Sequence, residues 1–392
     1  MKFDAIVIGA GPGGASTALS LARQGRSVAI IERSEFPRRK VCGEFISAVN
    51  LALLDRLGVG EAFRNLAGPE VARLALFASG AALEAPMPKA DSDAFGRALG
   101  RDVLDNLLLD AARHAGITVL QPWRAVEITR NGDLATVRIE ERGQAMDLAA
   151  PVVVAAHGSW EPGKLTSNLE KRNRPHDFLG FKAHLTQAKL ASNLMPLLLF
   201  PGGYGGMVWA DKGRLSISCC IRRDVLTQLR SNQPGLSAAQ VVHRHILASC
   251  PSAQTALADA RLHEEWLAAG PIRPGIRQQY QDDIFRVGNI AGESHPIIAE
   301  GISMALQSGW LLAEQLRQVQ IWDKAGRAVA GAAYAKAWRR QFAIRIHAAA
   351  FLAKLAIFPQ SASLVRTVVK VLPAALSVGA RVSGKTKTLP GF

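Results

Sequence analysis

Two kinds of hydrophobic pattern alternate along this chain of 392 residues. The first is a short apolar run bounded by polar residues, which is typical of a strand. Such runs cover 3–8, 27–31, 117–120, 151–156 and 283–288. The second pattern places apolar residues three and four positions apart and predicts helices. These helices are expected over 15–23, 51–57, 101–114, 238–249 and 301–315. Strands that alternate with helices favour an α/β fold with a parallel sheet.

The middle of the chain follows a different pattern. Between about 161 and 270, apolar and polar residues alternate singly, as over 214–221, which predicts antiparallel strands with one covered face. A hairpin is expected over 125–140, with its turn at Asn131-Gly132-Asp133. From 332 onward the chain is basic and predicted to be helical, with a frayed tail from Ser383. The chain therefore reads as a Rossmann-like nucleotide-binding domain with an antiparallel-sheet substrate domain and C-terminal helices.

These patterns divide the chain into three regions. The nucleotide-binding domain is expected to be assembled from separate segments, because the chain leaves its sheet and returns to it. The predicted regions are 1–80, 97–160 and 271–320 for this domain, 161–270 with 81–96 for the substrate domain, and 321–392 for the C-terminal helices.

Composition and charge exclude several classes of function. The chain has 47 Lys and Arg against 32 Asp and Glu, a net charge of +15, which suits a nucleic-acid or anionic-membrane partner. The basic residues form no long block and no nucleic-acid-binding motif, so we expect no nucleic-acid partner. Cys42, Cys219, Cys220 and Cys250 have neither a disulfide pattern nor metal-ligand spacing, and the adjacent pair is expected to point to opposite faces of a strand. We expect no metal and a cytoplasmic protein.

Much of the basic excess lies near the C-terminus. It comprises Lys336, Arg339, Arg340, Arg345, Lys354, Arg366, Lys370, Arg381, Lys385 and Lys387. From Trp338 to Phe358, basic and apolar residues mix at helical spacing. Two interpretations are open. The segment is either an interfacial helix that gives peripheral contact with the inner face of the membrane, or a helix that caps the substrate domain.

The strongest motif is Gly9-Ala10-Gly11-Pro12-Gly13-Gly14, which lies between the first predicted strand and helix. Glu32 stands at the end of the next strand, which completes a G-x-G-x-x-G turn in a βαβ setting. The glycines allow a tight turn and the approach of a pyrophosphate to backbone N–H groups. The helix start favours that anion, and Glu32 is placed to accept hydrogen bonds from ribose hydroxyls. The segment therefore predicts dinucleotide binding.

Two further segments accompany this turn. One is Arg38-Arg39-Lys40-Val41-Cys42-Gly43-Glu44, followed by the helix that opens at Arg101, and the other spans 288–302. Together the three segments resemble the flavoprotein superfamily of the para-hydroxybenzoate hydroxylase fold, which includes monooxygenases, geranylgeranyl reductases and flavin-dependent halogenases. The resemblance covers 1 to about 160 and about 270 to 316. The K-x-C-G-E element is most similar to the geranylgeranyl reductase-like branch.

The resemblance implies FAD as the cofactor. It places the ADP half on the glycine turn and Glu32, the adenine beside Val126, and the phosphates and ribityl chain near Arg101. In the family, the start of the helix after 300 faces the N1–C2 oxygen region of the flavin and stabilises its reduced anion. The remaining residues that we assign to the cofactor are Arg33, Lys40, Gly288, Asn289, Gly301 and Ile302.

Three departures from the family pattern affect the expected chemistry. Asn289 stands where the family has an Asp, so the hydrogen bond is kept and the charge is lost. The family's Asp-Gly motif is replaced by His157-Gly158, which leaves direct docking of NAD(P)H open. The reductases' Y-x-W-x-F-P pattern keeps Tyr204 but has Gly206 for the first Trp and lacks the Phe-Pro pair. The halogenases' W-x-W-x-I-P pattern is not found, which disfavours halogenation.

Three residues are candidates for catalysis. Cys42 is placed over the flavin by the resemblance and could donate a proton, or it is a buried small residue at a turn. Tyr204, flanked by glycines, is expected to form a substrate wall, and ordinary strand packing is the alternative. His295 could act as a base near neutral pH or be structural. Trp209 and Pro296 complete the predicted substrate contacts.

The sequence therefore predicts an FAD-dependent oxidoreductase with a small hydrophobic substrate. The interpretation that we favour from sequence is a monooxygenase that hydroxylates an aromatic or polyketide-like molecule of secondary metabolism. One alternative is a geranylgeranyl reductase-like enzyme that saturates alkene double bonds, and another is a flavin-binding redox sensor without turnover. The reductant is expected to be NAD(P)H or a partner reductase.

Overall fold

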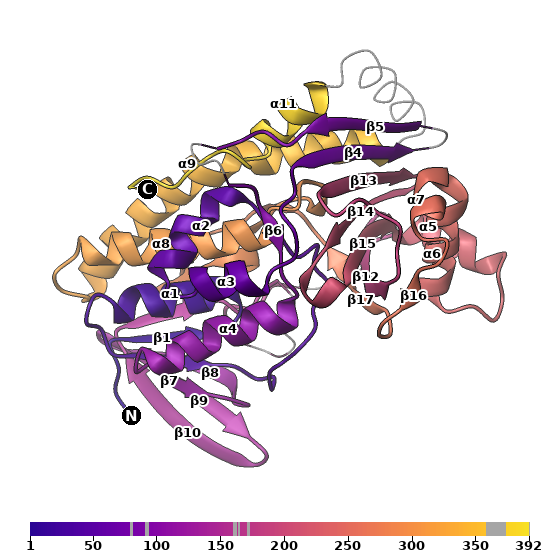
Figure 1. Cartoon of the computed structure of the whole chain (residues 1–392). Helices are drawn as coiled ribbons and strands as arrows, with labels where there is room; N and C mark the ends of the chain where they lie inside the picture. The colour runs from indigo at the N-terminus through magenta and orange to yellow at the C-terminus, as the bar shows by residue number, and fades with distance from the viewer. Residues whose placement is uncertain are drawn as a thin grey trace.

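The computed structural model describes the chain except for residues 79–80, 91–93, 160–162, 164, 171–172, 358–373 and 392. Its first layer is a six-stranded sheet in the order β19-β20-β11-β1-β2-β7, at the lower left of Figure 1. The strands are β1 Ala5–Ile8, β2 Val28–Ile31, β7 Thr118–Leu120, β11 Val152–Ala155, β19 Tyr280–Gln281 and β20 Ile284–Arg286. β1 pairs in parallel with β2 and β11, and these three strands are buried throughout, as their near-continuous apolar sequences require.

Both faces of this sheet are covered. On one face lie α1 Pro12–Ala22, α4 Arg101–His114 and α8 Gly301–Arg317. On the other lies a three-stranded antiparallel sheet of β8 Arg124–Asn131, β9 Leu134–Glu141 and β10 Gln144–Ala150. α1 and α8 touch closely, because a Cβ at Gly309 would lie 2.5 Å from the Gly13 carbonyl oxygen. The glycine turn and the start of α8 are thus held in one rigid unit.

The second layer is a sheet in the order β16-β12-β15-β14-β13-β4-β5, with β17 also paired to β12, and it is antiparallel except between β4 and β13. Its strands are β4 Arg73–Ala78, β5 Ala81–Pro86, β12 Phe178–Thr186, β13 Leu194–Phe200, β14 Gly203–Trp209, β15 Leu215–Arg222, β16 Arg261–Leu262 and β17 Leu267–Ile272. β4 pairs in parallel with β13 and thus joins this sheet before residue 81. The domain bounds that we predicted from sequence stay a prediction.

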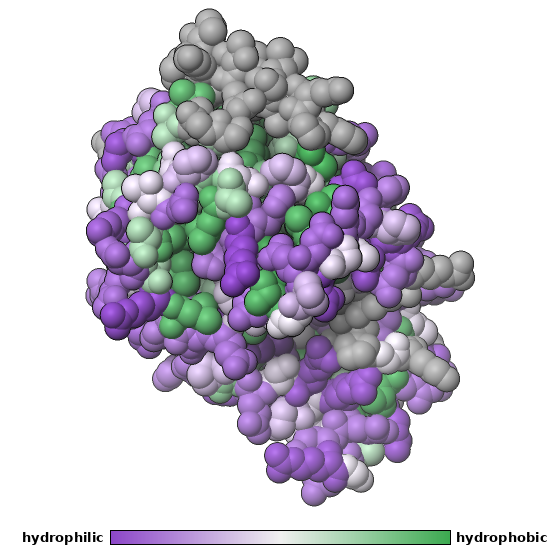
Figure 2. All heavy atoms as spheres, turned by 90° about the vertical axis from the view of Figure 1, so that its right-hand side faces the viewer, coloured by the Kyte–Doolittle hydropathy of each residue, from purple (hydrophilic) through white to green (hydrophobic). Residues whose placement is uncertain are grey.

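Helices cover both faces of the second sheet. One face packs against α5 Arg223–Ser231, α6 Ala238–Ser249 and α7 Pro251–Ala256. The side of the molecule that bears these helices is shown in Figure 2, where hydrophobic patches lie between hydrophilic side chains. The other face packs against the long helix α9 Lys324–Ile357. β15 is therefore buried on both faces, and the expectation of one covered face over 214–221 was wrong.

The strand register decides which side chains of this sheet meet. Tyr204 pairs with Cys220, and Cys220 pairs with Gly180. Directly paired residues point to the same face of a sheet, and residues two apart do so as well. Tyr204, Ser218, Cys220, Lys182 and His184 therefore share the face on which α9 lies. Cys219 lies in the opposite core, which confirms that the two adjacent cysteines point to opposite faces.

Short elements link the two layers. β3 Phe45–Ile46 pairs with β6 Arg97–Ala98, and β18 Gly275–Ile276 pairs with β21 Gly292–Glu293. The remaining short elements are the helices α2 Leu51–Arg56 and α3 Gly60–Leu66 and the 3₁₀ turns η1 Ala48–Asn50, η2 Asp211–Gly213, η3 Gly288–Ile290 and η4 Pro296–Ile298. The predicted fold class, a Rossmann-like sheet with an antiparallel sheet and C-terminal helices, is confirmed.

The C-terminal end of the chain is packed rather than frayed. After α11 Ala374–Val382, the side chains of Ser383, Lys385 and Leu389 are buried, so the prediction of a loose tail from Ser383 was wrong. Of the basic residues predicted near the C-terminus, Arg345 and Lys385 are buried, while Arg366 and Lys370 lie outside the described residues. None of the helices in the described part of the chain is long and apolar enough to cross a membrane.

Candidate active site

The glycine turn between β1 and α1 has no room for a side chain at two of its positions. A Cβ at Gly9, whose φ is +108°, would lie 2.7 Å from the Ala156 carbonyl oxygen, and one at Gly14 would lie 1.9 Å from the Gly9 oxygen. At Gly11 the nearest atom would be 3.7 Å away, so the turn is open on that side. Among the described residues, no side chain caps α1 at Pro12 and no acid lies in its first turn. The Gly9 and Ala10 amides donate within the fold, to Ile31 and Glu32, whereas the uncapped start of α1 beyond them can bind a pyrophosphate.

Glu32 is fixed at the end of β2 with its carboxylate turned toward the glycine turn. It is 3% exposed, and its Oε2 accepts a hydrogen bond from the Ala10 amide at 2.9 Å. Its Oε1 accepts one from the Ser34 amide at 2.9 Å. The guanidinium of Arg38 donates to both oxygens, at 3.1 and 3.2 Å. Burial lowers the pKa of Arg38, against the pull of the Glu32 charge. Arg38 was not among the predicted cofactor residues, although it stands in the Arg-Arg-Lys run that drew attention to Lys40.

The other residues predicted for the ADP half lie on separate elements. Arg33 is exposed just after β2, and Val126 lies on β8 in a bulge between Ala125 and Glu127. The ammonium of Lys40 is largely buried near Arg38, and burial first and then this charge lower the pKa of Lys40 to about 8.

Arg101 links the start of α4 to the Cys42 loop. Its guanidinium donates to both carboxylate oxygens of Asp105, at 2.6 and 2.7 Å, and lies near the Cys42 thiol. Burial alone would lower the pKa of Arg101, but Asp105 and Cys42 raise it above its ordinary value. The Cys42 sulfur accepts a hydrogen bond from the Glu44 amide at 3.4 Å. The predicted Cys42 and Arg101 are therefore brought together, with a cation beside the thiol.

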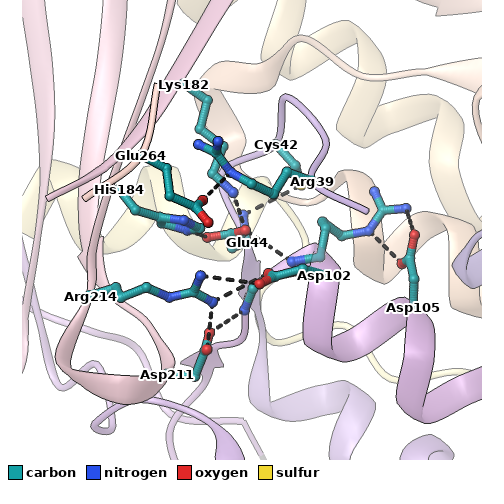
Figure 3. A network of polar contacts seen from close by, with 12 residues as sticks. Arg39, Cys42, Glu44, Asp102, Asp105, Lys182, His184, Asp211, Arg214 and Glu264 are labelled. Atoms are coloured by element: carbon teal, nitrogen blue, oxygen red, sulfur yellow. Dashed lines mark hydrogen bonds and ion pairs between the residues drawn. The ribbon is translucent and has the colours of Figure 1, made fainter. Parts of the chain in front are cut away.

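Glu44 is the centre of a buried ionic cluster (Figure 3). Its backbone has a left-handed φ of +64°, and its carboxylate contacts the Lys182 ammonium and the His184 Nε2, the latter at 2.8 Å. Oε1 also accepts the Arg101 amide at 3.0 Å, which caps α4. Burial would raise the pKa of Glu44, but the hydrogen bond from His184 and the charge of Lys182 lower it to about 2.

A second ionic cluster fixes the start of α4 from the other side. Asp211 accepts a hydrogen bond from the Gly100 amide at 2.7 Å and pairs with Arg214, which also reaches Asp102 at 3.1 Å. Asp211 and Arg214 directly precede β15 of the second layer, and Asp102 lies in the first turn of α4 in the first layer (Figure 3). The start of α4 is thus anchored by charges from both layers.

Asn289, which replaces the family's acid, contacts another carboxylate. Its Nδ2 donates to Glu293 Oε1 at 3.2 Å, and Arg277 donates to Glu293 Oε2 at 3.3 Å. Burial raises the pKa of Glu293, against the charge of Arg277. Gly288 has a φ of +67°, and its amide donates to Ser308 of α8 at 2.8 Å. An acidic group is therefore present at this position, four residues further along the chain than the family pattern predicts.

The start of α8 faces open space. Ala299 has a left-handed φ of +52°, which turns the chain into the helix, and no atom of the described chain would lie within 4 Å of a Cβ at Gly301. Ile302, the next residue, is buried in the first core. Because a helix start carries unpaired N–H groups, this end can receive a partly negative ring edge.

Tyr204 and His295, both predicted from sequence, form a hydrogen-bonded pair. The Tyr204 hydroxyl contacts His295 Nδ1, and the Phe178 ring packs edge-on against the imidazole at a centroid distance of 5.0 Å. Burial lowers the pKa of His295 to about 4, and burial followed by the Cys220 sulfur raises the pKa of Tyr204 well above its ordinary value. These shifts make His295 a weak base and Tyr204 a weak acid, which disfavours base catalysis by His295.

Two other predicted substrate residues have different outcomes. Pro296 directly follows His295 and is exposed, so it can line a cavity. Trp209 lies on the opposite face of β14 from Tyr204, packs in the second core and donates to the Leu190 carbonyl oxygen at 3.0 Å. The register therefore removes Trp209 from the wall formed by Tyr204. The remaining site assignments stay predictions.

Sequence reasoning missed the partners of Glu44. Lys182 and His184 are fully buried, and they stand two positions apart in the otherwise apolar strand 178–186. Charged or ionisable residues on the alternating positions of a buried strand are the signal that could have drawn attention to them, because such residues are rarely buried without partners.

The comparisons with known proteins agree with this geometry. The chain matches the model of the FAD binding domain family over residues 2–331. It belongs to this family. The family match confirms the predicted cofactor, FAD, and the tight glycine turn and the uncapped start of α1 are compatible with its ADP half. The protein is an FAD-dependent oxidoreductase.

Two curated relatives are reductases. The chain is 27% identical to the digeranylgeranylglycerophospholipid reductase of Methanothrix thermoacetophila, over 88% of this chain and 85% of that protein. It is 24% identical to the menaquinone reductase of Mycolicibacterium smegmatis, over 99% and 92%. Among solved structures, the flavin-dependent brominase Bmp2 has a TM-score of 0.77 at 17% identity and covers 98% of this chain and 94% of its own. This likeness shows the shared fold.

Proposed function

We propose that this flavoprotein is a reductase that saturates alkene double bonds in an isoprenoid chain. The observation that carries the proposal is its similarity, over most of both chains, to reductases whose names denote isoprenoid-bearing lipids. The Cys42 loop and the neutral, apolar surroundings of Tyr204 support it. The proposal favours the alternative that the K-x-C-G-E element indicated over the monooxygenase that we preferred from sequence.

Reduction of an alkene adds a hydride to one carbon and a proton to the other. Reduced FAD supplies the hydride. The thiol of Cys42, which lies near the Arg101 guanidinium, is the proposed source of the proton, and it takes up a proton from solvent before the next turnover. Tyr204, Phe178 and Pro296 hold the apolar chain. Each turnover consumes two electrons, which NAD(P)H or a partner reductase provides.

A single-turnover experiment tests this function. The FAD-loaded protein is reduced anaerobically with dithionite and mixed with a geranylgeranyl lipid, and the product is analysed by mass spectrometry. We expect two hydrogen atoms to be added to one double bond for each reduced flavin. Parallel samples with labelled O₂ and a panel of phenols test the monooxygenase interpretation, and incorporation of labelled oxygen would replace our proposal with it. Flavin that is not oxidised by either class of compound would indicate a redox sensor.

The role of Cys42 is tested separately. Cys42→Ser is expected to keep FAD bound and to lower the rate of product formation at least tenfold, because the hydroxyl is a far weaker acid than the thiol. Cys250→Ala removes a sulfur from the opposite core and serves as the control. An unchanged rate in Cys42→Ser would show that the thiol is a packing residue at a turn.

We also propose that α9 contacts the anionic lipid surface from which the substrate comes. The chain from Lys324 to its last residue carries twelve Lys and Arg and no acidic residue. One stripe of α9 is exposed throughout and mixes cationic and apolar side chains, with Ile344 69% and Phe351 62% exposed. Its members are Lys336, Arg340, Ile344, His347, Phe351 and Lys354. Basic and apolar residues on one helix face favour binding to anionic lipid.

Sedimentation with vesicles tests this contact. Phosphatidylglycerol vesicles should retain the protein and phosphatidylcholine vesicles should not, with retention falling as salt rises. Ile344→Gln with Phe351→Gln should reduce binding at least tenfold, whereas the control Leu134→Gln with Leu262→Gln, at two exposed residues outside α9, should not. Equal retention by both lipids, or no retention, would favour the interpretation of α9 as a helix that only caps the second sheet.

A further inference from the structure

Lys385 in the C-terminal tail carries its ammonium group into the interior of the protein. After α11 the chain turns at Gly384, where φ is +94° and a Cβ would lie 2.3 Å from the Arg345 side chain. The Lys385 side chain is 6% exposed, and Leu389 further along the tail packs in the first core. The tail is therefore a fixed part of the fold, and its lysine has been taken out of water.

The ammonium group contacts two loops at once. Lys385 Nζ donates to the Ile298 carbonyl oxygen at 2.8 Å and to Glu300 Oε1 at 2.9 Å. It also lies 4.7 Å from the centroid of the Phe45 ring, directly after the Cys42 loop. Glu300 Oε2 accepts a hydrogen bond from Ser47 at 3.3 Å. One tail residue thus joins the residues directly after the 38–44 segment to the 288–302 segment, and the family resemblance places Cys42 of the first and the helix start at Gly301 of the second beside the flavin ring.

The ion pair between Lys385 and Glu300 lies at the start of α8. Glu300 is fully buried and immediately precedes Gly301, the first residue of the helix. Its carboxylate opposes the partial positive charge of the helix start, which would otherwise stabilise a negatively charged reduced flavin. Lys385 neutralises this carboxylate. Without the ammonium, the buried negative charge would act on the ring.

We infer that Lys385 is a positioning residue for the flavin. It holds the loop before α8 against the Cys42 loop, and it balances Glu300 so that the start of α8 keeps its positive character toward the ring. The inference rests on the predicted position of the ring and is independent of the proposed substrate. A residue from the C-terminal tail thus sets both the affinity for FAD and the reduction potential of the bound flavin.

Removal of the Lys385 charge and removal of the Glu300 charge should shift the reduction potential of the flavin in opposite directions. A purely structural role of the two residues would not predict opposite shifts. In the FAD-loaded protein, Lys385→Met is expected to weaken FAD binding at least tenfold. It should also shift the redox equilibrium at least tenfold against reduced flavin, which is about 30 mV for a two-electron couple. Glu300→Gln leaves the ammonium unopposed and is expected to shift the equilibrium in the other direction. The measurements are FAD fluorescence for affinity and spectroelectrochemical titration for potential, neither of which needs a substrate.

Two further variants make the test decisive. Lys387→Met is the matched control, because the Lys387 ammonium donates to the Arg340 and Gln341 carbonyl oxygens on α9 and contacts neither loop. It should leave affinity and potential unchanged. The double variant Lys385→Met with Glu300→Gln removes both charges and should return the reduction potential to near the wild-type value. This measurement remains possible if the single variant Lys385→Met does not fold. Equal potentials in the Glu300→Gln, double-variant and wild-type proteins, or equal FAD affinity in Lys385→Met and Lys387→Met, would overturn the inference.

Discussion

Replacement of Glu44 by Gln tests the buried ionic cluster directly. The substitution keeps the size of the side chain and an oxygen that can accept the Arg101 amide, but it removes the negative charge that Lys182 and His184 face. All three side chains are fully buried. Loss of one partner from a buried ion pair is strongly destabilising, because the remaining charge has no access to water.

The pKa of Glu44 gives the magnitude and the pH range. Burial would raise this pKa, yet His184 and Lys182 lower it from 4.5 to about 2. Each pKa unit corresponds to about 1.4 kcal/mol, so the ionised carboxylate contributes about 3 kcal/mol to the free energy of unfolding. Because the folded pKa is the lower one, this contribution is complete above about pH 4.5 and is lost as the pH falls toward 2.

Urea unfolding from pH 7 to pH 3 measures this difference. We expect Glu44→Gln to lower the free energy of unfolding by about 3 kcal/mol at pH 7, and the gap to wild type to narrow below about pH 4.5. Asp55→Asn is the control, since Asp55 pairs with Arg64 on the surface, where solvent screens the interaction, and the substitution should change the free energy of unfolding little at any pH. A gap that stays constant across this pH range would refute the assignment of Glu44 as an ionised, buried partner of Lys182 and His184.

Three further substitutions test the other parts of the site. Gly14→Ala should abolish FAD retention on purification, because its Cβ would meet the Gly9 oxygen, whereas Gly379→Ala, whose Cβ meets no described atom within 4 Å, should retain FAD. Tyr204→Phe leaves buried His295 Nδ1 without its hydroxyl partner and should lower the free energy of unfolding by about 1–3 kcal/mol, and an unchanged urea midpoint would contradict the pairing. Asn289→Asp places a second carboxylate beside Glu293, so its Tm should fall further below that of wild type as the pH rises from about 5 to 8, and a Tm difference independent of pH would count against that contact.

The sequence predicts those elements whose limits are set locally. The helix expected over 101–114 matches α4 residue for residue, since Gly100 precedes it and Gly116 follows it. The helix over 238–249 likewise matches α6, which Ser237 caps through a hydrogen bond from the Gln240 amide. α1 begins at Pro12, three residues before the predicted start. The prediction missed these residues because a proline followed by two glycines is also typical of a turn.

The contacts that build the site depend on pairing between distant segments. Glu44 meets Lys182 and His184 across about 140 positions of sequence, and nothing local in either segment specifies the partner. β4 likewise joins the second sheet beside β13, more than a hundred residues later in the chain. The face to which Trp209 points follows from the register of β14, which a single-residue shift would reverse. The sequence shows which residue types are present, but it does not show which of these distant residues come into contact.

The buried ion pairs lie where the two layers join. Burial of a charge costs free energy, but at this interface the pairs determine how the layers pack together. The hydrophobic effect is non-directional, so an apolar interface alone would allow the two layers to pack in several similar arrangements. Glu44 with Lys182, and Asp211 with Gly100, each require one arrangement, because any other leaves a charge buried without its partner. Both pairs meet at the start of α4, from which Arg101 reaches Cys42. The position of the Cys42 thiol relative to the face of the second sheet that bears Tyr204 is therefore set by electrostatics, and variants that loosen these pairs should lose activity before they lose FAD.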